Sequence, residues 1–272
     1  MAPGVLALVL SSAALHVAWN AAARAQAGRL RYMWLIMVGG GLAGLIAAIP
    51  SLGGLQLQTV WPWLAATCLL HAFYFTTLAA AYRHSELAWA YSLSRALGVV
   101  ATAALALALF GQQLGPLAWG GLLLVVAGSL VGAGSFGQPQ ALWRVALIGF
   151  LIAGYTLVDS HAVRIAPPIA YVALLYLGAG LLVSPLALRG SRAQGDARGL
   201  GFGVLSIASY LLMLLAYRLG PAAPLLALRQ SAPLLAALAG YFFLREIPSR
   251  RLLLGTGLIV VGAVLFTLGP LG

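Results

Sequence analysis

Apolar residues fill the chain in runs of close to 20, and short segments rich in Arg, Pro, Gly and polar residues separate the runs. A run of this length lets an α-helix cross the roughly 30 Å hydrocarbon core of a bilayer with its backbone groups hydrogen-bonded internally. The runs lack the alternation of short β-barrel strands. The pattern therefore predicts an all-α integral membrane protein.

The ends of the runs define ten expected transmembrane helices, at 4–23, 31–49, 60–82, 87–109, 116–134, 143–163, 168–188, 200–219, 222–243 and 251–270. No basic segment precedes the first run, which favours a transmembrane helix over a signal peptide. Connections such as Gly111–Gly115 are very short, so neighbouring helices must run antiparallel. Because even the longest connection, Arg189–Gly199, is too short for a soluble domain, we expect the function to reside within the membrane.

The two halves of the chain resemble each other. His16–Arg24 lies over Tyr155–Arg164 in the overlay, and the tripeptide Ala-Tyr-Arg at 81–83 recurs at 216–218. Charged residues fall in register as well as leucines, which favours a true repeat over chance similarity.

The overlay divides the chain into five-helix repeats at 1–137 and 138–272. Since five is an odd number, the second repeat must enter the membrane from the opposite side, so the repeats are inverted. Inverted repeats are typical of secondary transporters, in which the two halves open a central site alternately to each side.

Composition agrees with a membrane protein, because 62% of the 272 residues are hydrophobic and 7% are charged. The net charge of +11 comes from arginines that mostly stand singly between apolar runs, with no lysine. Such arginines are topology signals facing lipid headgroups, so we expect the bilayer and a small-molecule substrate as partners and no nucleic acid.

Cys68 is the only cysteine, which excludes an internal disulfide and a cysteine-based metal site. We expect no metal and no cofactor.

Most arginines lie in connections that follow odd-numbered helices, whereas connections after even-numbered helices hold only Arg164 and Arg218. The positive-inside rule alone puts both termini outside.

Several motifs together resemble a known family. They are HVAWN at 16–20, GYTLVDSHAVR at 154–164, an arginine in each of the fourth and ninth helices, and the final FLREIPSRRLLLGTGLIVVGAVL. Their order and spacing resemble the EamA-like branch of the drug/metabolite transporter superfamily over essentially the whole chain.

The resemblance implies a ten-helix basket of two inverted five-helix repeats, with a substrate cavity lined largely by helices 1, 3, 4, 6, 8 and 9. It also implies a multi-pass protein of the cell (inner) membrane with both termini in the cytoplasm, opposite to the arginine count, so the orientation stays open. Members move amino acids, other small metabolites, nucleotide sugars or lipid-linked sugars, which leaves the substrate open as well.

Arg95 and Arg229 lie deep within expected helices. A charge in the hydrocarbon region costs at least about 2 kcal/mol, so such residues usually face a cavity or the bundle interior. Pro233 removes the N–H that would bond to the Arg229 carbonyl, and Gly98 can bend the fourth helix at the corresponding level. The alternative is a tolerated kink, with Arg229 bonded to nearby carbonyls.

Asp159 is the only acid well inside an expected helix. From the sequence it can form a salt bridge with Arg95 or Arg229, bind a substrate ammonium group or carry a proton. Two positive charges and one negative suit a carboxylate-bearing or zwitterionic ligand.

Helical spacing places further polar side chains on common faces, with His16 and Asn20 four residues apart. Hydrogen bonding between helices is the alternative role for such residues. The expected substrate-binding residues are His16, Asn20, His71, Tyr74, Trp89, Tyr91, Arg95, Tyr155, Asp159 and Arg229. Small residues at Gly128 and Gly132, and at Gly40 and Gly44, predict close helix packing.

We therefore expect a secondary transporter, an exporter or facilitator of a small polar metabolite such as an amino acid or related carboxylate, working by alternating access as a monomer or homodimer. A flippase for a lipid or lipid-linked sugar is the alternative within the same fold. An enzyme is disfavoured, because the sequence has no HExxH or GxSxG element and no pair of acids within one helix.

Overall fold

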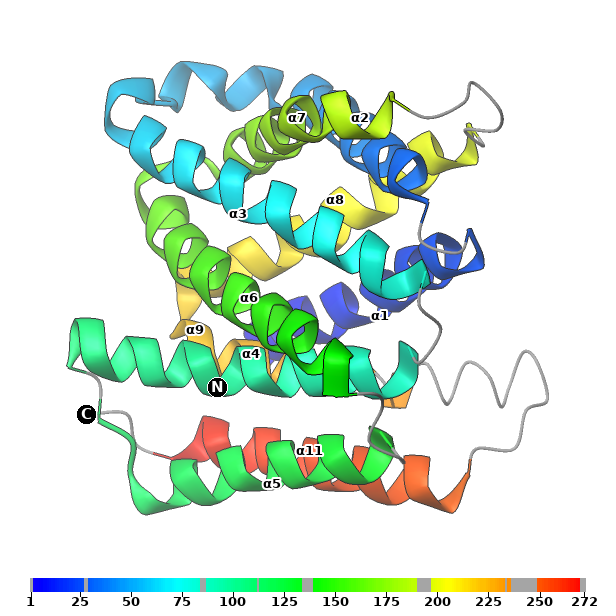
Figure 1. Ribbon diagram of the computed structural model, residues 1–272. Helices are drawn as coiled ribbons and strands as arrows, with labels where there is room; N and C mark the ends of the chain where they lie inside the picture. Colours follow the sequence, from blue (N-terminus) through cyan, green and yellow to red (C-terminus); the bar gives the residue numbers. More distant parts are fainter. Residues whose placement is uncertain are drawn as a thin grey trace.

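The computed structural model describes residues 2–26, 29–83, 87–111, 113–133, 139–189, 197–232, 234–235 and 249–269, and these ranges contain helices and no strand (Figure 1). The helices are α1 (Pro3–Ala25), α2 (Leu30–Ala48), η1 (Ile49–Gly54), α3 (Leu57–Arg83), α4 (Leu87–Phe110), α5 (Pro116–Ala133), α6 (Pro139–Ile165), α7 (Pro168–Ala187), α8 (Arg198–Leu219), α9 (Ala222–Arg229) and α11 (Arg250–Leu268).

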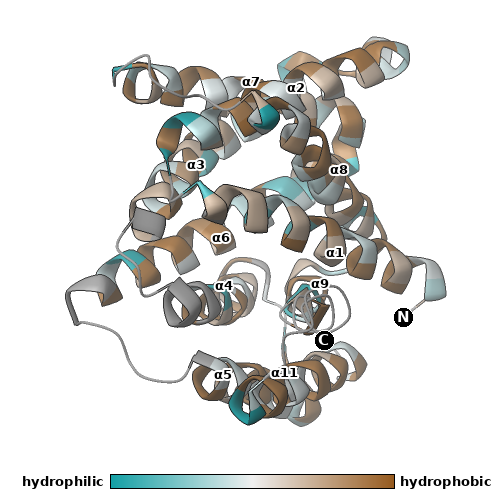
Figure 2. Ribbon diagram, turned by 90° about the vertical axis from the view of Figure 1, so that its right-hand side faces the viewer, coloured by the Kyte–Doolittle hydropathy of each residue, from teal (hydrophilic) through white to brown (hydrophobic). Residues whose placement is uncertain are grey.

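The described residues include seven helices long and apolar enough to cross a membrane, together with two shorter apolar helices at Leu93–Leu109 and Pro116–Gly132. Large apolar side chains cover their outward faces, and Leu181 and Leu123 are 73% and 66% exposed. Figure 2 shows hydrophobic residues along the outward sides of α5 and α11. Long apolar helices with exposed apolar faces confirm an all-α, multi-pass membrane protein.

The ninth expected helix, 222–243, is interrupted beyond Arg229. Residues 232, 234 and 235 are helical again, and 236–243 lie outside the described residues. Helix α9 itself ends at Arg229. The Gln230 N–H then donates to the Ala227 carbonyl at 2.9 Å, and the Ser231 N–H donates to the Leu228 carbonyl at 3.1 Å. These are tight three-residue turns, which fit the sequence, because Pro233 lacks the N–H that would bond to the Arg229 carbonyl in a continuous helix.

The helix is not interrupted at Gly98, since α4 continues from Leu87 to Phe110. A Cβ atom at Gly98 would lie 2.8 Å from Ile152 Cγ2, so this glycine permits α4 to pack closely on α6. Of the two predicted interruptions, only the one beside Arg229 forms.

The helices pack in layers, which Figure 1 shows from the side. At one end α2 packs against α7 and α8, in the middle α6 packs against α3 and α4, and α1 packs against α8. At the other end α5 and α11 lie side by side. The arrangement leaves α1, α3, α4, α6, α8 and α9 around the centre.

Glycines set the closest helix contacts, as predicted for Gly128 and Gly40. A Cβ atom at Gly128 would lie 2.5 Å from the Gly255 carbonyl oxygen, and one at Gly40 would lie 2.6 Å from the Gly203 carbonyl oxygen. The backbones of α5 and α11, and of α2 and α8, therefore touch directly, which maximises dispersion contacts where lipid offers no hydrophobic driving force.

Candidate functional site

Four of the predicted residues form one buried hydrogen-bonded group, the cationic cluster, made of His16 and Asn20 of α1, Arg95 of α4 and Arg229 of α9. Each is at most 8% exposed. The imidazole of His16 lies at its centre, because Arg95 Nη1 is 2.8 Å from Nε2 and Arg229 Nη2 is 3.2 Å from Nδ1. Three helices distant in sequence thus meet at one histidine.

The His16 ring cannot satisfy both guanidinium groups. Asn20 Nδ2 lies 3.1 Å from His16 Nε2 and also donates to the His16 carbonyl at 2.9 Å, so the amide nitrogen faces the ring. With Asn20 and Arg95 both directing N–H groups at Nε2, this nitrogen is the acceptor, and in a neutral imidazole Nδ1 then carries the proton. Arg229 Nη2 therefore faces another donor.

Arg229 is only partly satisfied by the described residues. Its Nη2 donates to Ser209 Oγ at 3.1 Å, and its Cζ lies 6.0 Å from the centre of the Tyr210 ring, which is cation–π distance. Its Nε is buried and has no hydrogen-bond partner within the described ranges. A buried N–H of a cation without an acceptor is costly, so the cluster is suited to receive an acceptor from a ligand.

The end of α9 also shapes the cluster. Gln230, the first residue beyond the helix, accepts a hydrogen bond at Oε1 from Arg95 Nε at 3.2 Å. Ser12 Oγ donates to the Ser209 carbonyl at 2.7 Å, and Ser209 Oγ donates to the Ser12 carbonyl at 2.8 Å, so α1 and α8 are held together beside Arg229.

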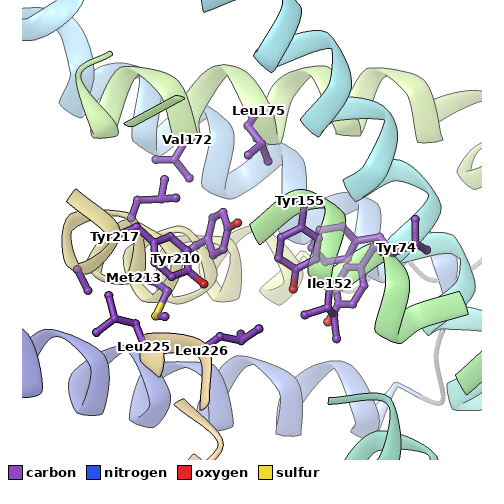
Figure 3. Close-up of a cluster of buried hydrophobic side chains, with 14 of the residues drawn as sticks. Tyr74, Ile152, Tyr155, Val172, Leu175, Tyr210, Met213, Tyr217, Leu225 and Leu226 are labelled. Carbon is purple, nitrogen blue, oxygen red and sulfur yellow. The ribbon is translucent and has the colours of Figure 1, made fainter. Parts of the chain in front are cut away.

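An aromatic group borders the cluster, formed by His71 and Tyr74 of α3, Tyr155 of α6 and Tyr210 of α8. Ring centres are 4.4 Å apart for His71 and Tyr155, 5.4 Å for His71 and Tyr210, and 5.5 Å for Tyr74 and Tyr155. Figure 3 shows these tyrosine rings between the level of Leu175 on α7 and that of Leu226 on α9. The structure thus brings three more predicted residues, His71, Tyr74 and Tyr155, to the centre.

Asp159 is fully buried and bonded by phenols. The Tyr171 hydroxyl donates to Oδ1 at 2.6 Å, and the Tyr210 hydroxyl makes a short bond to Oδ2. The salt bridge with Arg95 or Arg229 that the sequence allowed is therefore not formed. Instead Tyr210 lies between the two groups. Its hydroxyl bonds to the Asp159 carboxylate, and its ring lies beside the Arg229 guanidinium.

Sequence and structure comparisons find proteins similar to this chain. The model of the EamA-like transporter family fits residues 141–268. The second half of the chain is therefore similar to the EamA-like transporter family. It is similar to the uncharacterized transporter YwfM of Bacillus subtilis, with 28% identity over 129 residues, covering 45% of this chain and 43% of that protein, so the match spans less than half of the relative. A protein of known crystal structure shares the fold, with a TM-score of 0.77 at 22% identity over 96% of both chains.

The matched family and the Bacillus relative are both described as transporters. Within the described ranges, no three His, Cys, Asp or Glu side chains gather as metal ligands would.

Two of the predicted site residues, Trp89 and Tyr91, have their backbone in α4, but their side chains lie outside the described residues.

Sequence reasoning missed Ser209, Tyr210, Tyr171 and Gln230. The repeat held a signal for two of them, because the register that places Ala-Tyr-Arg 81–83 over 216–218 also places Tyr74 over Ser209 and Arg95 over Gln230. Nothing local marks Tyr171, since its role follows from which helices pack together.

Tyr210→Phe is expected to lower the free energy of unfolding by about 1.5–3 kcal/mol, because it removes one of two donors to a buried carboxylate and keeps the ring. Tyr176→Phe is the matched control, since the Tyr176 hydroxyl bonds only to the neutral Ser206 hydroxyl at 2.9 Å, and it should cost about 0.5–1.5 kcal/mol. Denaturant unfolding in detergent measures both. If Tyr210→Phe lowers the free energy of unfolding no more than the control does, the hydrogen bond from Tyr210 to Asp159 does not stabilise the fold as proposed.

Proposed function

We propose that this transporter moves a small metabolite bearing a carboxylate, such as an amino acid, and that the carboxylate binds at the cationic cluster. The observation that carries the proposal is the convergence of two buried guanidinium groups on one imidazole. Arg229 offers its unpartnered Nε beside Nη2, and this edge of a guanidinium matches the two oxygens of a carboxylate.

The charge balance favours an anionic group at this position. Asp159 is the only acid among the described residues, and its oxygens are taken by Tyr171 and Tyr210. A carboxylate would therefore supply a negative charge that no described residue places beside Arg229. The aromatic group lies next to the cluster and suits the ammonium end of a zwitterion.

Alternating access of two inverted repeats is the transport mechanism that we propose. Helix packing supports it, because α1 packs on α8 as α6 packs on α3, and α2 packs on α8 as α7 packs on α3. In each of these two comparisons, the second contact is the equivalent of the first after the two repeats are exchanged. The end of α9 at Arg229 supplies a hinge beside the ligand position. With no phosphate-binding loop in the sequence, a gradient across the cell (inner) membrane would drive an exporter or facilitator.

Thermal stabilisation by matched ligands tests the substrate class. An amino acid that binds the folded protein should raise the unfolding midpoint as its concentration passes the Kd, whereas its methyl ester and the amine lacking the carboxylate should not. Organic acids, nucleotide sugars and phospholipids complete the panel.

Equal shifts with the acid and its methyl ester would contradict carboxylate recognition. A response to a phospholipid alone would replace the small-metabolite transporter by the flippase.

A further inference from the structure

A cavity of about 530 Å³ lies between the ends of α6, α8 and α9, and no residue of the cationic cluster lines it. Its polar lining consists of Ser160, His161 and Arg164 from α6 and Arg218 from α8, and the turn into α9 closes one wall. The volume is sufficient for a small organic anion or a lipid headgroup.

The charges on this side of the protein are concentrated in the cavity. Arg164 and Arg218 are the only arginines in the connections that follow even-numbered predicted helices, and those connections contain no lysine or acidic residue. Both arginines line this cavity, and the described residues that line it include no acid. Two like charges sharing an opening without a counter-charge create a positive potential that attracts anions.

The start of α9 adds to this potential. Ala222 and Ala223, the first two residues of the helix, line the cavity, and the preceding Pro221 makes no side-chain cap. The N–H groups of a first helical turn and the positive end of the helix dipole favour a bound anion. His161 lies at the same opening and is stacked on Trp63, with ring centres 4.3 Å apart, which holds its imidazole in place.

We propose that this cavity is an oxyanion-binding site separate from the cationic cluster, with Arg164 and Arg218 as the principal ligands of a phosphate or carboxylate group. The anion can be a soluble one or the phosphate of an anionic lipid, since both present the same charged oxygens. The site is independent of the proposed transport function, because none of its lining residues belongs to the cationic cluster.

Binding of inorganic phosphate to the detergent-purified full chain, measured by titration calorimetry, tests the soluble source. The Arg164→Gln, Arg218→Gln double variant should weaken binding by at least about tenfold, and added salt should weaken binding to the wild-type protein. Arg144→Gln is the matched control, because Arg144 lies at the opposite end of α6 and its Cζ is 5.1 Å from the Trp143 ring centre. Binding should persist in Arg229→Met, which separates this site from the cationic cluster.

Nanodiscs of phosphatidylcholine with and without phosphatidylglycerol test the lipid source, with retained lipid counted by native mass spectrometry. Loss of phosphatidylglycerol retention in the double variant, with phosphate inert in the wild type, would assign the site to a headgroup. Equal binding of both probes by the double variant and the wild type would overturn the proposal, as would an equal loss in Arg144→Gln. Unchanged elution in size-exclusion chromatography shows that the variants remain folded.

Discussion

Gly121→Ala is expected to cause the largest loss of stability of any single methyl group added to this protein. The new Cβ would lie 2.3 Å from the Phe266 amide nitrogen and 2.5 Å from the Gly262 carbonyl oxygen, both in the backbone of α11. A backbone inside a helix cannot move aside as a side chain can, so α5 and α11 must separate along their whole contact. We expect a loss of at least about 3 kcal/mol, the upper end of ordinary overpacking.

Gly120→Ala is the matched control, because a Cβ atom at Gly120 meets nothing within 4 Å. Alanine favours a helix over glycine by up to about 1 kcal/mol, so the control should be neutral or stabilising. Gly262→Ala and Gly257→Ala repeat the comparison from α11, since Gly262 faces the backbone of α5 and Gly257 faces open space. Unfolding midpoints in detergent give the result, and equal losses at Gly120 and Gly121 would show that the close contact is not maintained in the membrane protein.

Arg229→Met is expected to abolish ligand stabilisation while leaving the ligand-free protein as stable as the wild type or more so. Methionine fills a similar volume and removes a buried charge whose Nε has no partner among the described residues. Replacing buried charges by apolar groups of similar shape is often neutral or stabilising by about 1–4 kcal/mol. The loss of a charge-assisted pair with a carboxylate should weaken the affinity by at least about tenfold.

The two readouts separate a ligand-binding role from a structural one. If Arg229 only tied α9 to Ser209 and His16, methionine would lower the unfolding midpoint of the ligand-free protein and leave any ligand shift intact. Ser209→Ala is the control for the hydrogen bond between Arg229 and Ser209, because it removes the acceptor of this bond and keeps the charge of Arg229. That variant should retain the ligand shift.

Much of the fold follows from the sequence because the bilayer restricts what apolar runs can do. A run such as 168–188 must form a helix, since its backbone groups find no partners in lipid, and α7 indeed extends from Pro168 to Ala187. The cost of an intramembrane charge likewise places Arg95 and Arg229 in the interior before any contact is known. Helical spacing identified His16 and Asn20 as neighbours, because residues four apart lie about one helical turn from each other on the same face.

Only the tertiary structure decided which partners these residues have. The pairing of Asp159 with Tyr171 and Tyr210, in place of an arginine, depends on how α6, α7 and α8 pack, and no local pattern encodes that packing. The end of α9 at Arg229 placed Gln230 against Arg95, although the apolar run continues past this point in the sequence. Hydrophobicity and helical period therefore determined which residues are inside the protein, and interhelical packing determined what each of them binds.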